Sequence, residues 1–207
     1  KIISWAARAS PSCRRIRRWP NAAEDALRQY FKPTFNNGDV PLTETQIADG
    51  FASHDALAPT VSDQITADII AAGAAGSGRL IANFGVGVNH IDLVAAKSAG
   101  LAVSNTPGVL TDATADLALT LMLMVSRRAG EGERELRAGG WHGWRPTHLM
   151  GRSLSGKTLG IIGMGRIGKA VAYRAALGFG MKIIFFNRSK VNNITDYDAE
   201  QIDDLDT

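Results

Sequence analysis

The sequence is poor in cysteine, in long apolar runs and in net charge, and each shortage excludes a class of protein. With a single cysteine, Cys13, the chain cannot form a disulfide within itself, which fits a reducing compartment. Its most apolar stretch, residues 113–125, is interrupted by Thr114, Asp116 and Thr120 and is shorter than the ~18 apolar residues of a membrane span. We therefore expect a soluble, cytoplasmic protein without a membrane-spanning segment.

The charge is nearly balanced but unevenly distributed. The formal net charge is +3, yet residues 1–20 carry six cations and no acid, so the remaining chain is slightly acidic. Nucleic-acid binding by the folded body is therefore not expected. We treat residues 1–20 as an irregular basic segment without an assigned function, because an acid-free segment of this kind can be a transit peptide or a misread start.

The most informative stretch is a glycine-rich turn after an apolar run. Leu159–Ile162 leads into a Gly-x-Gly-x-x-Gly turn, and a helical pattern follows. Gly163 permits the sharp turn, Gly165 lets a pyrophosphate approach the backbone, and Gly168 lets the helix pack closely on the strand. The phosphates would lie at the helix N-terminus, where free N–H groups and the helix dipole favour an anion. A second apolar run, Met181–Phe186, follows at the spacing of a βαβ unit, so we predict a dinucleotide site rather than a purely structural turn.

The residues after this second run indicate which dinucleotide is bound. A βαβ unit that prefers NAD usually places Asp or Glu there, against the ribose 2′-hydroxyl. This chain has Asn187, Arg188 and Ser189 instead. No carboxylate would repel a 2′-phosphate, and a guanidinium can bind one through two parallel hydrogen bonds, so NADP(H) is favoured while NAD(H) stays possible. The alternative is that Arg188 is a solvated loop cation.

Elsewhere in the chain, predicted strands alternate with predicted helices, which indicates an α/β fold with a mainly parallel sheet. A capping-box signature at Thr43–Gln46 predicts the start of one helix. Residues 106–108, Thr-Pro-Gly, interrupt the alternation, and we place a domain boundary there, between residues 21–107 and 108–207. Beyond it, Thr111 is predicted to cap a long apolar helix. The predicted strands are residues 56–58, 80–84, 101–103, 159–162 and 181–186.

Four motifs occur in the same order as in a known family. They are Asn83–Asp92, Ser104–Asp112, Gly140–Trp144 and the glycine turn that begins at Gly163. Together they resemble the D-isomer-specific 2-hydroxyacid dehydrogenases, and among these the glyoxylate and hydroxypyruvate reductases. The resemblance implies a parallel-sheet, flavodoxin-like substrate domain over residues 21–107 and the first part of a Rossmann NAD(P)-binding domain over residues 108–207. It also implies an active site between two such domains.

The resemblance assigns roles to particular residues. Backbone amides of Val86 and Gly87 would receive the substrate carboxylate, although a Gly-x-Gly loop can also be a structural turn. Residues around 111–150 would form an arm exchanged in a homodimer, from which Trp144 approaches the partner's active site. Alternatively, Trp141 and Trp144 only pin a long connection to the surface. The residues expected at the cofactor are Thr111, Gly163, Gly165, Arg166, Ile167, Gly168, Asn187, Arg188 and Ser189.

We predict the reduction, with NADPH, of a small 2-keto acid of the glyoxylate or hydroxypyruvate type to the 2-hydroxy acid. In the resembled family the catalytic His, its carboxylate partner and a substrate-orienting Arg lie in the second half of the cofactor domain, which we expect beyond Thr207. The chain is then a fragment, inactive alone, which ends just after the second strand of the glycine-turn unit and leaves a sheet edge exposed. No metal is expected, because the four histidines lack metal-ligand spacing.

Two other functions compete with this prediction. The fold could serve as a non-enzymatic NAD(P)-sensing binding module, as in the related transcriptional corepressors, because a fold does not determine a function. The chain could also belong to another member of the family, such as a phosphoglycerate dehydrogenase. The catalytic residues expected beyond Thr207 would separate the enzyme from the sensor.

Overall fold

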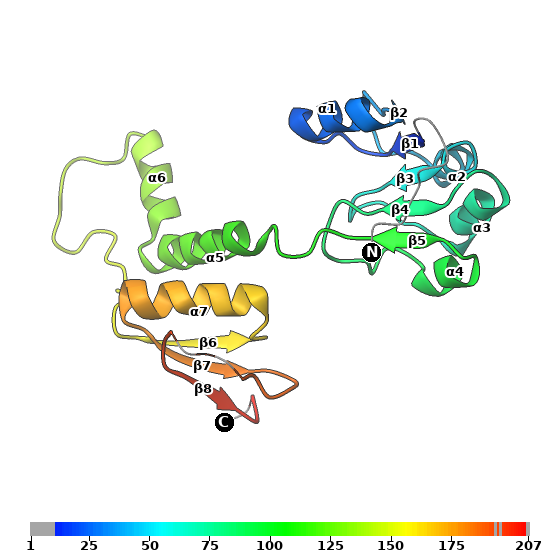
Figure 1. Ribbon diagram of the computed structural model, residues 1–207. Helices are drawn as coiled ribbons and strands as arrows, with labels where there is room; N and C mark the ends of the chain where they lie inside the picture. Colours follow the sequence, from blue (N-terminus) through cyan, green and yellow to red (C-terminus); the bar gives the residue numbers. More distant parts are fainter. Residues whose placement is uncertain (1–10, 193, 195, 206–207) are drawn as a thin grey trace. The chain divides into compact units, whose positions relative to one another are not determined.

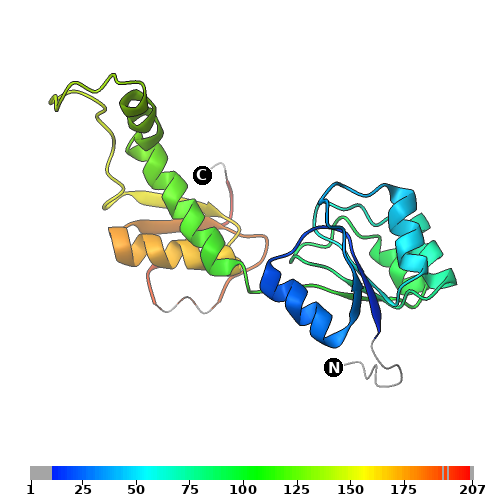
Figure 2. The same ribbon diagram turned by 90° about the horizontal axis from the view of Figure 1, so that it is seen from above.

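The computed structural model describes residues 11–192, 194 and 196–205 of the chain. The chain divides into two compact units, Lys1–Pro107 and Gly108–Thr207, each with its own sheet (Figures 1 and 2). The predicted α/β class with parallel sheets is confirmed, since the paired strands of both sheets run parallel. No helix among the described residues is long and apolar enough to cross a membrane.

The first unit is built on a five-stranded sheet. Its strands are β1 (Ser12–Arg15), β2 (Lys32–Thr34), β3 (Ala56–Ala58), β4 (Leu80–Ala82) and β5 (Ala102–Ser104). The helices that connect them are α1 (Asn21–Tyr30), α2 (Glu44–Ala52), α3 (Ala67–Ala75) and α4 (Leu93–Ser98). The strand order β2-β1-β3-β4-β5 is that of flavodoxin-like folds. The main core joins Leu57 and Ile81 of the sheet to Phe51 of α2 and Ile69 of α3, all of them fully buried.

Side-chain caps determine where the helices of this unit begin. The predicted capping box is confirmed at α2, where the Gln46 N–H donates to Thr43 Oγ1 over 3.2 Å and the Thr43 N–H donates to Gln46 Oε1 over 2.9 Å. Thr66 and Asp92 cap α3 and α4 by accepting the N–H of the residue three positions later, without the second hydrogen bond of a capping box. Both helices therefore start one residue after a capping side chain.

Strand β1 corrects the expectation that residues 1–20 are irregular. Residues 12–15 form a central strand that pairs with both β2 and β3, and the Ser12 N–H and hydroxyl donate to Asp55 Oδ2 over 2.8 and 2.7 Å. Arg15 is fully buried, but Glu24 of α1 lies 2.8 Å from it and the Phe35 ring stacks against its guanidinium. Because its charge is compensated, Arg15 occupies a core position that an apolar residue would normally fill. Residues 1–10 of the same segment lie outside the described residues.

The second unit is a three-stranded sheet covered by helices on one face (Figure 1). Its strands are β6 (Thr158–Ile162), β7 (Lys182–Phe186) and β8 (Ala199–Ile202), and its helices are α5 (Thr111–Ser126), α6 (Ala129–Arg137) and α7 (Arg166–Phe179). α7 packs on the sheet through Val171 and Ala175, and α5 packs on α7. Arg174 of α7 bonds Asp112 and Asp116 of α5 over 3.0 and 2.7 Å, so charge pairing reinforces the contact between the two helices.

Strand β8 corrects the expectation that the chain stops just after the second strand of the glycine-turn unit. Residues 199–202 pair in parallel with β7, in the order β6-β7-β8. The sequence Ala-Glu-Gln-Ile alternates only weakly between polar and apolar residues, so its period does not identify a strand. Among the described residues β6 pairs only with β7, and its Ile162 side chain is 76% exposed.

The buried ion pair of the first unit leads to a stability prediction. We expect Glu24→Ala to lower the free energy of unfolding by about 3 kcal/mol, because it leaves the buried Arg15 guanidinium without a compensating charge. The matched control is Asp25→Ala on the same helix. Asp25 is exposed and, among the described residues, pairs only with Arg28, so this change should cost less than about 1 kcal/mol in urea denaturation. Equal losses in the two variants would show that the buried ion pair contributes no more to the free energy of unfolding than the exposed pair.

Candidate functional site

The glycine turn of the second unit joins the end of β6 to the start of α7, and each of its three glycines meets a different constraint. Gly163 has φ +96°, a left-handed conformation that side chains other than glycine's rarely adopt. A Cβ added at Gly165 would meet no atom within 4 Å, so the backbone there is open to a ligand. A Cβ added at Gly168 would lie 2.2 Å from the Gly163 carbonyl oxygen, so the helix can approach the turn only without one.

The N-terminus of α7 suits an anion. Its N-cap is Gly165, which offers no side chain to cap the first N–H groups, and its first turn contains no acidic residue. No side chain of α7 therefore neutralises the positive end of the helix dipole. An open backbone, free N–H groups and the neighbouring Arg166 together fit the pyrophosphate of a dinucleotide.

Asn187, the first residue after β7, supports the glycine turn through a side-chain hydrogen bond. Its Oδ1 accepts the Met164 N–H over 3.1 Å, while its Nδ2 donates to the Ser189 carbonyl over 2.9 Å. The structure thus places Asn187 beside the turn and Ser189 beside Asn187, because the loops after neighbouring parallel strands lie at the same edge of the sheet. The guanidinium of Arg188 is exposed and has no hydrogen bond or ion pair within the described part of the chain, which leaves its donors free.

Gln201 of β8 is a residue of this site that sequence reasoning missed. Its Nε2 donates to the Asn187 carbonyl over 3.4 Å and to the Ser189 carbonyl over 3.2 Å, and its Oε1 accepts the Val191 N–H over 3.0 Å. The Gln201 amide therefore holds the loop that follows β7 through three hydrogen bonds. The sequence carries no signal for this contact, because β8 was not predicted.

Thr111 lies at the start of α5, but it does not cap that helix. The N-cap is Leu110, without a side-chain hydrogen bond, and Thr111 is already the first helical residue. The predicted cap at Thr111 is therefore wrong. The next residue, Asp112, bonds Arg174 of α7, so this end of α5 lies against the helix that begins at the glycine turn.

In the first unit, the loop between β4 and α4 holds its carbonyl groups in a fixed direction. The Gly85 and Gly87 carbonyls accept from Asn83 Nδ2 over 3.1 and 2.8 Å, and the Gly85 carbonyl also accepts the Thr106 N–H over 3.0 Å. The Val86 carbonyl accepts from Asn105 Nδ2 over 2.9 Å. The N–H groups of Val86 and Gly87 have no acceptor among the described residues. Successive free N–H groups beside bonded carbonyls form the kind of concavity that binds anions.

A pocket of about 310 Å³ lies against this loop. His90 on its wall is buried, and burial lowers the pKa of the imidazole below its ordinary value, an effect that the negative charge of Asp63 opposes. The side chain is therefore mostly neutral near pH 7. The lining residues are Val61, Gln64, Gly87, Asn89 and His90.

Trp141 and Trp144, whose segment was predicted to form an exchanged arm, lie in the connection between α6 and β6. Glu135 of α6 forms an ion pair with Arg145 over 3.3 Å and lies 2.9 Å from His148 Nε2, and these contacts tie the connection to the helix. Trp144 is 82% exposed and Trp141 is 53% exposed. Charge pairing rather than tryptophan packing thus anchors this segment, and the Trp144 ring is left available to another surface.

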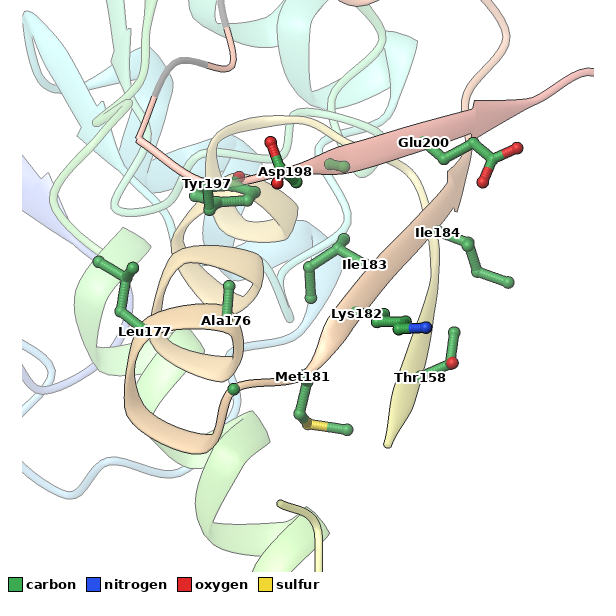
Figure 3. Close-up of a pocket in the computed structure, with 12 residues that line it drawn as sticks. Thr158, Ala176, Leu177, Met181, Lys182, Ile183, Ile184, Tyr197, Asp198 and Glu200 are labelled. Atoms are coloured by element: carbon green, nitrogen blue, oxygen red, sulfur yellow. The ribbon is translucent and has the colours of Figure 1, made fainter. Parts of the chain in front are cut away.

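The second unit also contains a larger hollow of about 700 Å³, which is separate from the glycine turn (Figure 3). Thr158 and Lys182, the first residues of β6 and β7, line this hollow. The glycine turn follows the last residue of β6, so the hollow and the turn lie at opposite ends of that strand. None of the residues predicted at the cofactor lines the hollow. Within the described part of the chain, no group of three or more His, Cys, Asp or Glu residues is placed to hold a metal ion.

Comparison with known proteins identifies a family to which the second unit is similar. Residues 119–207 match the family model described as D-isomer specific 2-hydroxyacid dehydrogenase, NAD binding domain. The chain is 47% identical over 140 residues to a glyoxylate reductase of Thermococcus litoralis, covering 66% of this chain and 41% of that protein. It is 37% identical over 190 residues to a glycerate dehydrogenase of Hyphomicrobium methylovorum, covering 91% and 58%. The chain thus spans about half the length of these curated relatives.

Solved structures agree with the sequence comparison. A glyoxylate reductase from Paecilomyes thermophila superimposes with a TM-score of 0.74 at 30% identity, covering 94% of this chain and 61% of that one. The holo form of Rhodotorula graminis D-mandelate dehydrogenase gives a TM-score of 0.79 at 27% identity, covering 96% and 62%. The resemblance inferred from the four motifs is confirmed, and the second unit carries an NAD-binding domain whose cofactor is a nicotinamide dinucleotide.

The different surroundings of two glycines give a testable contrast. We expect Gly168→Ala to lower the free energy of unfolding by roughly 1–3 kcal/mol, because its Cβ would overlap a backbone oxygen that cannot move aside. Gly165→Ala places its Cβ in open space and should change stability by less than about 1 kcal/mol in urea denaturation. A Gly165 variant as unstable as the Gly168 variant would mean that the backbone at Gly165 is not open.

Proposed function

Residues 119–207 belong to the NAD-binding domain of the D-isomer specific 2-hydroxyacid dehydrogenases, and from this premise we propose that the chain is a member of that family and serves the NADPH-dependent reduction of a small 2-keto acid to the 2-hydroxy acid. The observation that carries the proposal is the open glycine turn at Gly165, beside an α7 N-terminus without a cap or an acid. The names of two relatives, a glyoxylate reductase and a glycerate dehydrogenase, support a substrate of two or three carbons.

The dinucleotide is assigned to the second unit. Its pyrophosphate would be held by the N–H groups between Gly165 and Gly168, with Gly163 shaping the turn and Arg166 and Ile167 at the first turn of α7. Thr111 at the start of α5 would complete the site. When bound, the dinucleotide supplies the hydride that reduces the keto carbon.

The substrate carboxylate is assigned to the first unit. The free N–H groups of Val86 and Gly87 would bind its oxygens, since the carbonyls on either side are already bonded to Asn83 and Asn105. This contact orients the acid and leaves its keto group free to react. We assign the proton transfer to no residue of this chain.

The preference for NADP(H) rests on the loop after β7. Asn187 stands where an NAD-preferring domain has a carboxylate, and its amide is occupied by Met164 and Ser189. It therefore presents no negative charge to a 2′-phosphate. Arg188 is exposed and unpaired among the described residues, so its guanidinium can form charge-assisted hydrogen bonds with that phosphate.

Arg188→Ala tests the cofactor assignment. We expect NADPH binding to the 207-residue chain to weaken about tenfold, the effect of losing one charge-assisted contact, while NADH binding changes less than about twofold. Fluorescence titration with each reduced dinucleotide measures both affinities. Lys182→Ala is the control, because it removes a cation from the opposite end of the same strand. Equal losses for NADPH and NADH would contradict the assignment, and a chain that binds neither dinucleotide would contradict the proposed function.

We also propose that two copies of the chain associate through α5 and the connection after α6. Leu117, Leu121 and Val125 of α5 are each more than half exposed, and Trp144 is the most exposed aromatic residue of the described chain. The three α5 residues follow one another at four-residue spacing on one helix face, and such exposed apolar faces are typical of a surface that another protein covers. From such an arm, Trp144 would reach the substrate site of the second copy.

Trp144→Ala tests this arrangement. We expect at least a tenfold weaker dimer, because a large aromatic side chain in an interface contributes roughly 2 kcal/mol or more. Sedimentation velocity over a dilution series measures the association. Tyr30→Ala is the control, since Tyr30 is an exposed aromatic of the first unit, 64% accessible, outside the proposed surface. A monomeric wild-type chain, or an unchanged dimer in the Trp144 variant, would rule out the proposed arm.

A further inference from the structure

The Asn83 side chain faces two carbonyl groups, which determines how its amide is oriented. One terminal atom lies 3.1 and 2.8 Å from the Gly85 and Gly87 carbonyl oxygens. Carbonyl oxygens only accept hydrogen bonds, so this atom must be the amide nitrogen Nδ2, and both of its hydrogens are used. The amide oxygen Oδ1 must then point the other way.

On that other side lies His90. Its Nε2 is 3.0 Å from Asn83 Oδ1, and both side chains are more than nine-tenths buried. Because Oδ1 can only accept, Nε2 must carry the hydrogen. Burial lowers the pKa of His90 against the opposing charge of Asp63, so the neutral ring has one N–H and places it on Nε2.

The backbone of His90 is held by a different part of the unit. Its carbonyl accepts the Ile65 N–H over 2.8 Å, and Ile65 also forms a parallel bridge with Ile91. The main chain at His90 is therefore fixed relative to the segment that precedes α3, and its ring bonds Asn83 from this fixed position. His90 can therefore hold, through Asn83, the loop that contains Gly85 and Gly87.

We propose that His90 is a positioning residue for the carboxylate-binding loop: its Nε2–H holds the Asn83 amide in the orientation that fixes the Gly87 carbonyl and reinforces the Gly85 carbonyl, which the Thr106 N–H also holds, so that the Val86 and Gly87 N–H groups stay available. The inference rests on the proposed function, in which those N–H groups receive the substrate carboxylate. Without the donor, the Asn83 amide can rotate and turn Oδ1 toward the two carbonyls. Oxygen would then face oxygen, and the loop would lose the arrangement that binds an anion.

Nuclear magnetic resonance of the 207-residue chain tests the inference, with sodium glycolate as the carboxylate probe. We expect the ring nitrogens of His90 to show the Nε2–H tautomer and the Val86 and Gly87 amide signals to shift on titration. His90→Leu removes the donor and should weaken glycolate binding about tenfold. His90→Gln keeps an amide N–H at similar reach and should stay within about threefold of the wild type.

Two further variants separate positioning from general damage. His54→Leu is the control, because His54 is another hydrogen-bonded histidine of the first unit, paired with Thr34 and the Gly50 carbonyl away from this loop. It should leave glycolate binding unchanged. Asn83→Asp cannot donate to the carbonyls and should lose as much affinity as His90→Leu, and combining the two changes should add little, since both act on one hydrogen-bonded unit.

The outcomes are distinguishable. An Nδ1–H tautomer, or unaltered glycolate affinity in His90→Leu, would overturn the positioning role. If glycolate shifts no wild-type amide, the substrate assignment fails instead. The role of His90 is then decided by the Asn83 side-chain NH₂ group, whose protection from exchange with water should be lost in His90→Leu and kept in His90→Gln.

Discussion

Parallel pairing of short strands is the constraint on which both candidate loops depend. Parallel strands all end at the same edge of a sheet, so the loops that leave them lie side by side. In the first unit Asn105, just after β5, bonds the loop that follows β4. In the second, Asn187, just after β7, bonds the turn that follows β6. The two units share this device: an asparagine at the end of one strand supports the backbone that leaves its neighbour.

The sequence predicts the features that local chemistry determines. The glycine turn, the capping box at Thr43 and the alternation of strands and helices all depend on residues close together in the chain, and the structure contains each of them. The motifs were also sufficient to identify the family. Local chemistry has limits, however: Thr111 has the right side chain for a cap, yet the helix begins one residue too early for it to act as one.

The features that the sequence did not predict depend on distant partners. Strand β1 contains two arginines and looks unsuited to a sheet until Glu24 and Phe35 are placed around Arg15. Strand β8 is a weak pattern that becomes a strand because β7 offers it an edge. The contacts of Gln201 with the loop after β7, and of His90 with Asn83, likewise require the fold before they can be seen.

The way the two loops are held has a consequence for the thermodynamics of binding. The carbonyls of Gly85, Val86 and Gly87 are bonded to groups of their own unit, and Gly168 packs against the Gly163 carbonyl, so contacts within the protein hold both loops. The conformational entropy of ordering these segments is thus lost during folding and not during association. An anion that enters either loop meets a preorganised backbone, so its affinity is set by the contacts it makes and not by a rearrangement of the chain.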